Sequence, residues 1–242
     1  MLVKTNDNSN TLFSTKYNQH FHDITIGAIQ ESLVKHIIPA FDFHKQKEHL
    51  KILDICFGLG YNTFSTINYI IENRLNKKVE IFSPELDSDL IESLKDFEYP
   101  KEFQKISPII KELLETKKYK DENVQIELFI GDARSYIKTL KDIDIVYQDA
   151  FSSKVNNELW TVEYFKDIYK ATSDDTIITT YSIASNIRLS LYKAGFFIYE
   201  IKIKDGKKQT IALKTKQEIS NTKYIDMELK QLRNKGLKAL YD

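Results

Sequence analysis

The sequence lacks several features that would assign it to a specialised class of protein. Cys56 is its only cysteine, so an intramolecular disulfide is excluded and a reducing compartment is expected. No apolar run approaches the ~20 residues that span a bilayer, and the first residues have no apolar signal-peptide core. Repeats and low-complexity tracts are also missing. We therefore expect a cytoplasmic globular protein with no membrane partner.

The chain also has no excess of positive or negative charge, because 35 Lys and Arg residues balance 35 Asp and Glu residues. Whole-chain charge therefore gives no support for nucleic-acid binding, which would depend on a locally basic face. A length of 242 residues suits one large α/β domain. We predict a single domain with an N-terminal arm and helix in 1–45, a Rossmann-like core in 46–214 and a helical tail in 215–242.

The most informative stretch is an apolar run that ends in an acid and a glycine turn, Lys51-Ile-Leu-Asp-Ile-Cys-Phe-Gly-Leu-Gly-Tyr-Asn62. Such a pattern is typical of a buried parallel strand that leads into a helix, expected here over 63–76. Gly58 and Gly60 carry no Cβ, so the backbone can adopt positive φ and approach a ligand closely. The free N–H groups at the helix start favour a polar or anionic group.

Three interpretations of this turn stay open on the residues alone. Counted from the acid, the pattern is Asp54-x-Cys56-x-Gly58-x-Gly60. This resembles the acid-x-Gly-x-Gly-x-Gly turn of class I S-adenosylmethionine-dependent methyltransferases, with cysteine in place of the first glycine. A nucleotide site is the second interpretation, although the third glycine of the dinucleotide fingerprint is absent. An ordinary tight turn between strand and helix is the third.

Four successive predicted strands end in an acid, namely Asp54, Glu85, Asp132 and Asp149. Ligands of open α/β sheets lie outside the carboxyl ends of the strands, so the four acids are expected to line one crevice. A sulfonium and an ammonium group make S-adenosylmethionine a cation that such a crevice attracts. Glu85 is expected either to bind the ribose hydroxyls or to be a solvated loop glutamate. We expect Asp132 to accept from the adenine amino group, and Asp149 to orient an acceptor amine and take up its proton.

The order of elements predicts an α/β, Rossmann-like class I methyltransferase fold, with a seven-stranded, mostly parallel sheet that ends in an antiparallel β-hairpin. The hairpin is indicated by β-rich runs at 196–203 and 209–213 around Asp205-Gly206. The aromatic stripe in the helix over 157–171 is more typical of core than of a base-stacking platform. The other expected strands lie over 50–55, 78–85, 125–130, 144–148 and 176–181. Helices are expected over 29–43 and 135–140, with two more within 90–120 and one that ends at 193. The tail over 216–242 is expected to be one polar helix that packs Ile225, Leu229 and Leu232 on the domain.

Several stretches in order resemble the MnmC-like methyltransferases, over roughly residues 11 to 214. The most specific are Phe57-Gly-Leu-Gly-Tyr-Asn62 and Asp149-Ala-Phe-Ser-Ser-Lys-Val-Asn-Asn-Glu-Leu-Trp-Thr161. Further matching stretches are Tyr17-Asn-Gln-His-Phe-His-Asp-Ile24, Gly27-Ala-Ile-Gln-Glu31, Ile81-Phe-Ser-Pro-Glu85, Leu128-Phe-Ile-Gly-Asp132, Ala194-Gly-Phe196 and Lys207-Lys-Gln209.

The resemblance implies methyl transfer from S-adenosyl-L-methionine to the 5-aminomethyl nitrogen of a modified wobble uridine in tRNA. It implies Asp149 as the catalytic residue. The donor-binding residues that it implies are Glu31, Asp54, Cys56, Phe57, Gly58, Gly60, Asn62, Glu85, Asp132 and Ala133. The substrate-binding residues that it implies are Phe151, Lys154, Lys207 and Lys208. We expect a stand-alone, monomeric methyltransferase domain without FAD, to which an upstream tRNA-modifying complex supplies the substrate.

Three departures from the family pattern affect this expectation. Cys56 replaces a glycine near the donor. The loop Ser152-Ser-Lys-Val-Asn-Asn157 has no proline, and Lys207-Lys-Gln-Thr210 stands for a Lys-Arg-Glu-like motif. The last two departures lie where the acceptor is expected, so they bear on the identity of the substrate more than on the donor.

Alternative functions and sites were weighed against this interpretation. An aminopropyltransferase of the spermidine-synthase type shares the fold, and a non-catalytic donor- or RNA-binding module is the third possibility. His20, His22 and His36 match no metal template, so no metal site is predicted. Lysines around the hairpin are either RNA contacts or a solvated edge that discourages strand pairing, namely Lys202, Lys204, Lys207, Lys208, Lys214 and Lys216.

Overall fold

The computed structural model describes residues 2–203 and 206–242. By its internal packing the chain divides into two compact units, Met1–Ala133 and Arg134–Asp242. Each unit is described separately, and the single-domain organisation stays a prediction. No helix among the described residues is both long and apolar enough to cross a membrane.

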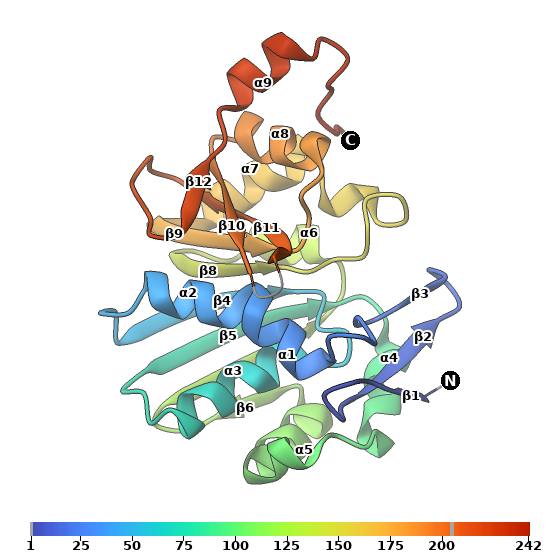
Figure 1. The fold of residues 1–242 in the computed structure, drawn as a ribbon. Coiled ribbons are helices and arrows are strands. Elements are labelled where there is room, and N and C mark those ends of the chain that lie inside the picture. The colour runs from blue at the N-terminus through green and yellow to red at the C-terminus, as the bar shows by residue number, and fades with distance from the viewer. Residues whose placement is uncertain (1, 204–205) are drawn as a thin grey trace. The chain divides into compact units, whose positions relative to one another are not determined.

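The main sheet of the first unit has the strand order β4-β5-β7-β6 (Figure 1). Strand β5 is parallel to both β4 and β7, whereas β6 runs antiparallel to β7. The parallel strands bury nearly continuous apolar runs, as expected where both faces of a sheet are covered. The bounds are β4 His49–Ile55, β5 Lys78–Glu85, β6 Lys118–Lys120 and β7 Val124–Ile130.

Helices of the first unit cover this sheet. The predicted helix over 29–43 is confirmed as an unbroken helical stretch, α1 (Ala28–Ser32), the π-helical η1 (Leu33–Ile37) and α2 (Ile38–Phe43). It packs against α3 (Tyr61–Glu72), the helix that follows the glycine turn. The helical segments expected within 90–120 are separated at Tyr99-Pro100. The elements around it are α4 Ser88–Ser93, η2 Leu94–Asp96, η3 Lys101–Ile106 and α5 Ser107–Thr116.

The N-terminal arm forms a small antiparallel sheet in the order β1-β2-β3. Its strands are β1 Leu2–Lys4, β2 Asn10–Ser14 and β3 Gln19–His20. The arm is tied to the start of α3, because the Tyr61 hydroxyl accepts from the Asn10 amide at 3.1 Å and donates to the Asn10 carbonyl at 2.8 Å. The predicted N-terminal arm is therefore an ordered part of the first unit.

The second unit contains strands in the order β12-β10-β11-β9-β8. Strand β8 is parallel to β9, and the remaining pairs are antiparallel. The predicted hairpin is confirmed, with Phe197 paired to Leu213 and Lys202 to Lys208; Asp205 of its turn lies outside the described residues. The bounds are α6 Ala133–Ile137, β8 Ile143–Gln148, η4 Asn157–Leu159, α7 Val162–Ala171, β9 Thr172–Thr180, α8 Ser185–Lys193, β10 Phe197–Lys202, β11 Lys208–Leu213, β12 Thr222–Tyr224 and α9 Met227–Arg233.

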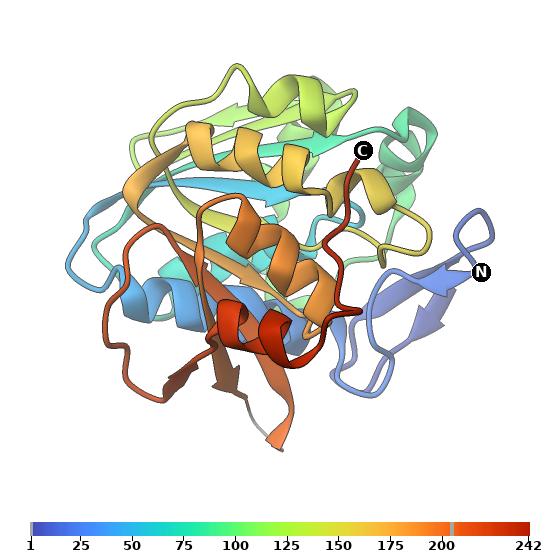
Figure 2. The same cartoon turned by 90° about the horizontal axis from the view of Figure 1, so that it is seen from above.

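The tail differs from its prediction. Instead of one helix, it forms the strand β12 against β10 and then the short helix α9, which buries Met227. Leu229 and Leu232 are 41% and 74% exposed, so the predicted packing face is wrong. The last residues run past α7 and α8 (Figure 2), where the Leu240 carbonyl accepts from the Val162 amide and the Leu240 amide donates to the Ser190 hydroxyl. Threonine and tyrosine at 222–224 favour a strand over a helix.

The aromatic stripe of α7 and its preceding turn is core, as predicted. Trp160, Tyr164 and Phe165 are all fully buried. Buried polar groups support them, because the Tyr164 hydroxyl donates to Gln148 Oε1 at 2.8 Å. The short edge strands β6 and β12 were not predicted, and with them the main-sheet strands number four in the first unit and five in the second, against the seven expected.

Candidate functional site

The glycine turn after β4 adopts left-handed backbone conformations at alternate residues. Cys56, Gly58 and Gly60 have φ values of 66°, 55° and 79°. Gly60 is required, because a Cβ there would lie 2.5 Å from the Phe64 ring and 2.7 Å from the Phe57 ring. The half-buried Cys56 therefore holds a conformation that favours glycine, and the substitution has left the backbone of the turn in place.

Asp54 acts inside the protein. Its side chain is fully buried, and its carboxylate accepts from the Thr63 hydroxyl at 2.7 Å and from the Asn62 amide at 3.3 Å. The acid thereby fixes the first turn of α3 directly after the glycine turn. Its expected part in donor binding stays a prediction.

Glu85, at the end of β5, lies beside the glycine turn. One carboxylate oxygen accepts from the Gly58 amide at 2.9 Å and the other from the Asp87 amide at 3.0 Å. Burial raises the pKa of Glu85 above its ordinary value and outweighs these two hydrogen bonds. The next residue, Leu86, is 64% exposed although it is apolar. Sequence reasoning missed Leu86, whose only signal is its place after the strand-end acid.

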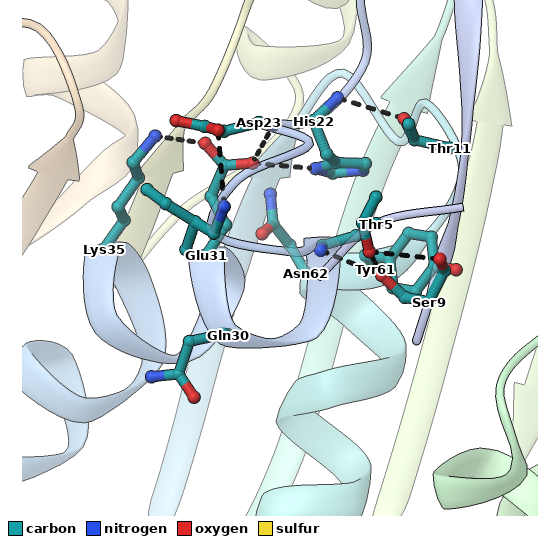
Figure 3. A network of polar contacts seen from close by, with 12 residues as sticks. Thr5, Ser9, Thr11, His22, Asp23, Gln30, Glu31, Lys35, Tyr61 and Asn62 are labelled. Atoms are coloured by element: carbon teal, nitrogen blue, oxygen red, sulfur yellow. Dashed lines mark hydrogen bonds and ion pairs between the residues drawn. The ribbon is translucent and has the colours of Figure 1, made fainter. Parts of the chain in front are cut away.

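Glu31 belongs to a network that joins the arm to α1 (Figure 3). Its carboxylate accepts from the Asp23 amide at 2.8 Å and from the Lys35 ammonium, and it lies 3.4 Å from His22 Nδ1. Burial alone would raise the pKa of Glu31, but the hydrogen bond from His22 and the charge of Lys35 hold it far below its ordinary value. Glu31 thus anchors the arm, a role that its position in the sequence did not reveal.

The arm lies against the glycine turn. The Phe21 ring is 3.3 Å from the place where a Gly58 Cβ would stand, and the neighbouring His22 packs edge-on against Tyr61 at 5.0 Å. From the other side, the Tyr99 hydroxyl donates to the Leu59 carbonyl at 2.9 Å. Residues far apart in the sequence therefore hold one turn, and no local pattern pointed to Phe21 or Tyr99.

Asp132 and Ala133 follow β7 in the same unit. Asp132 is exposed, and the preceding Gly131 donates its amide to the Glu85 carbonyl at 2.8 Å. Ile130 is 37% exposed at the end of the strand. The first unit therefore brings the ends of β5 and β7 together, as the sequence predicted, and adds two exposed apolar side chains to them.

The remaining predicted residues lie in the second unit. Asp149 follows β8 and is half-buried, and Phe151 and Lys154 belong to the loop after it. Two aromatic residues hold this loop. The Tyr181 hydroxyl donates to the Ala150 carbonyl at 2.9 Å, and the indole N–H of Trp160 donates to the Phe151 carbonyl at 2.8 Å.

Most of the predicted basic face is engaged within the protein. Lys208 pairs with Glu200 at 2.8 Å, and Glu200 also accepts from the buried Arg188. The ammonium groups of Lys214 and Lys216 lie 4.5 Å and 4.4 Å from the ring centroids of tyrosines. Lys202 and Lys207 are exposed, and Lys204 lies outside the described residues. Most lysines of the predicted basic face therefore make contacts within the protein. No group of three metal-ligating side chains occurs within 2–203 and 206–242.

The fold and the glycine turn define the class: an α/β protein with a class I S-adenosylmethionine-dependent methyltransferase fold. A family described as S-adenosyl-L-methionine-dependent methyltransferase matches residues 95–216, about half of the chain. The chain belongs to this family, that of the MnmC methyltransferase domain.

Individual relatives agree with this assignment. The crystal structure of MnmC2 from Aquifex aeolicus superposes with a TM-score of 0.80 at 29% identity and covers 96% of this chain and 75% of that one. Protein MJ0670 of Methanocaldococcus jannaschii is 32% identical over 88% of this chain and 58% of its own length. The tRNA 5-methylaminomethyl-2-thiouridine biosynthesis bifunctional protein MnmC of Campylobacter jejuni is 26% identical over 80% of this chain, which spans 33% of that protein.

Proposed function

We propose that this methyltransferase methylates the 5-aminomethyl nitrogen of a modified wobble uridine in tRNA, giving the methylaminomethyl product. The observation that carries the proposal is the match to MnmC2 over 96% of the chain. The name of the Campylobacter relative, which refers to 5-methylaminomethyl-2-thiouridine biosynthesis, supplies the nucleoside. We place the reaction in the cytoplasm, where tRNA is modified, and expect no FAD requirement.

The turn after β4 fits S-adenosylmethionine, which supplies a methyl group on a sulfonium. Gly58 lets the backbone approach the donor closely, and the Glu85 carboxylate beside it suits ribose hydroxyls. Exposed Leu86 offers an apolar surface of the kind an adenine ring covers. Asp132, exposed after β7, is the acceptor that we assign to the adenine amino group.

We assign Asp149 to the acceptor. The amine must present a neutral lone pair in line with the bond between sulfur and the methyl carbon. As the new bond to nitrogen forms, the bond to sulfur breaks and leaves a neutral thioether. A carboxylate that accepts a hydrogen bond from the amine orients it and takes up the proton that the methylated amine loses. Phe151 and Lys154 follow in the same loop and are assigned to the uridine and its phosphate.

Methyl transfer from labelled S-adenosylmethionine to bulk tRNA of cells that lack the activity tests this function. We expect labelled tRNA with the unaltered protein. For Asp149→Asn we expect turnover reduced by about 100-fold or more, the usual contribution of a positioned acid or base. Donor binding should be retained. Donor binding is measured by the reaction of Cys56, the only cysteine, with N-ethylmaleimide. A bound donor should shield the half-buried thiol from this reagent.

The outcomes separate the two assignments. Donor protection without labelled tRNA would refute tRNA as the acceptor and leave the donor site standing. Labelled tRNA with undiminished turnover in Asp149→Asn would refute the role of Asp149. Transfer of an aminopropyl group from the decarboxylated donor to a polyamine would replace the proposal with the aminopropyltransferase function.

A further inference from the structure

The loop that follows β8 has no proline to stiffen it, yet it is ordered by hydrogen bonds. Within the loop, the Val155 and Asn156 amides donate to the Ser152 carbonyl at 2.9 and 3.0 Å. These bonds close a turn several residues beyond Asp149. They leave the peptide groups of the Ala150 and Phe151 carbonyls to be held by other parts of the second unit.

Two aromatic side chains hold those peptide groups. Tyr181 donates its hydroxyl proton to the Ala150 carbonyl at 2.9 Å, and Trp160 donates its indole proton to the Phe151 carbonyl at 2.8 Å. The two rings pack edge-to-face, with centroids 5.9 Å apart and an interplanar angle of 81°. Trp160 is fully buried, so it provides a fixed support for both bonds.

The sheet explains why Tyr181 reaches this loop. Tyr181 is the first residue after β9, and β9 is the parallel neighbour of β8, with Tyr147 paired to Thr179. Parallel strands end at the same edge of a sheet, so a side chain just beyond β9 faces the backbone just beyond β8. Asp149 and Ala150 stand directly after β8, in reach of the Tyr181 hydroxyl.

We propose that Tyr181 is a positioning residue that acts through Asp149. Its hydroxyl fixes the carbonyl of Ala150, the residue after Asp149, and so fixes the direction in which the carboxylate meets the acceptor amine. This inference rests on the proposed function of Asp149. Alignment of reacting groups contributes a large part of such a rate, and a small displacement of the carboxylate lowers turnover without changing donor binding.

Tyr181→Phe removes only the hydroxyl, and Tyr199→Phe is a matched control. The Tyr199 hydroxyl, also in the second unit, donates to the Gln217 carbonyl at 2.8 Å and accepts from the Gln217 amide at 2.9 Å, so it is also tied to the backbone. We expect Tyr181→Phe to lower kcat by about 3- to 10-fold, the effect of one lost hydrogen bond, with the KM for the donor unchanged. Tyr199→Phe should lower the melting temperature by an amount similar to that for Tyr181→Phe, and it should leave kcat unchanged.

Amide hydrogen exchange gives a readout that does not depend on turnover. In Tyr181→Phe, exchange at Val155 and Asn156 should become faster, whereas Tyr199→Phe should leave it as it is. Unchanged exchange, or faster exchange with unchanged kcat, would overturn the inference. Absence of tRNA methylation by the unaltered protein would instead refute the proposed function, and the positioning role for the reaction would fall with it.

Discussion

The backbone of Cys56 leads to a prediction about the stability of the glycine turn. Its φ of 66° is costly for any residue with a Cβ. Two substitutions separate this cost from the thiol itself. Cys56→Ala removes the thiol and keeps the Cβ, whereas Cys56→Gly removes both. The difference in stability between the two variants therefore reports the backbone strain at this position, offset by the greater entropy of glycine in the unfolded chain.

The magnitude follows from two opposing contributions. Left-handed backbone costs a residue with a Cβ about 1–2 kcal/mol relative to glycine. Glycine loses about 0.4–1 kcal/mol through the greater entropy of its unfolded chain. The balance makes Cys56→Gly more stable than Cys56→Ala by about 1 kcal/mol, which corresponds to a melting temperature about 2–4 °C higher in a protein of this size.

Thermal unfolding followed by circular dichroism measures this difference. S-adenosylmethionine affinity, measured by calorimetry, should be retained in Cys56→Gly because the backbone of the turn is already that of a glycine. A Cys56→Ala variant as stable as Cys56→Gly, or more stable, would show that position 56 does not hold the left-handed conformation. The account of the turn would then be wrong.

Two further predictions concern the pH dependence of stability. The pKa of Glu31 is depressed, so its ion pairs stabilise the fold above the ordinary glutamate pKa of 4.5 and are lost as pH falls through the depressed value. Glu31→Gln should therefore cost about 2 kcal/mol at pH 7 and progressively less below about pH 4, as urea unfolding at each pH will show; a pH-independent cost would contradict this reasoning. Glu85 has a raised pKa, so the folded protein loses stability as pH rises from 4.5 through that raised value. Glu85→Gln should flatten this slope in the same measurement while weakening donor binding about tenfold; an unchanged slope together with unchanged affinity would refute both roles of Glu85.

Local patterns predicted much of the fold. Strand β5 has the bounds expected from its alternation and its terminal acid, and the hairpin of β10 and β11 follows from two β-rich runs around one turn. The prediction of one tail helix failed because the helical spacing of its apolar residues was not matched by burial. Leu229 and Leu232 face solvent. Three-residue edge strands such as β6 carry too few residues for any pattern to appear.

The sequence proposes which residue types form the candidate site, but it does not reveal how these residues are connected. The acids at the ends of β4 and β5 were recognised, yet Asp54 proved to hold α3 while Glu85 holds Gly58. Contacts such as Phe21 over the glycine turn join residues far apart in the chain, and no periodicity records them. Tyr181 stayed hidden for the same reason, since its importance depends on a carbonyl 31 positions away.

The nucleoside that receives the methyl group tests the central claim most directly. After incubation with labelled S-adenosylmethionine, tRNA from cells that lack the activity is digested and its nucleosides are separated by liquid chromatography and mass spectrometry. We predict label in 5-methylaminomethyluridine or its 2-thio form, with a rate of labelling about 100-fold or more lower in Asp149→Asn. Label confined to another nucleoside, or none in tRNA while the donor still protects Cys56, would contradict the assigned acceptor.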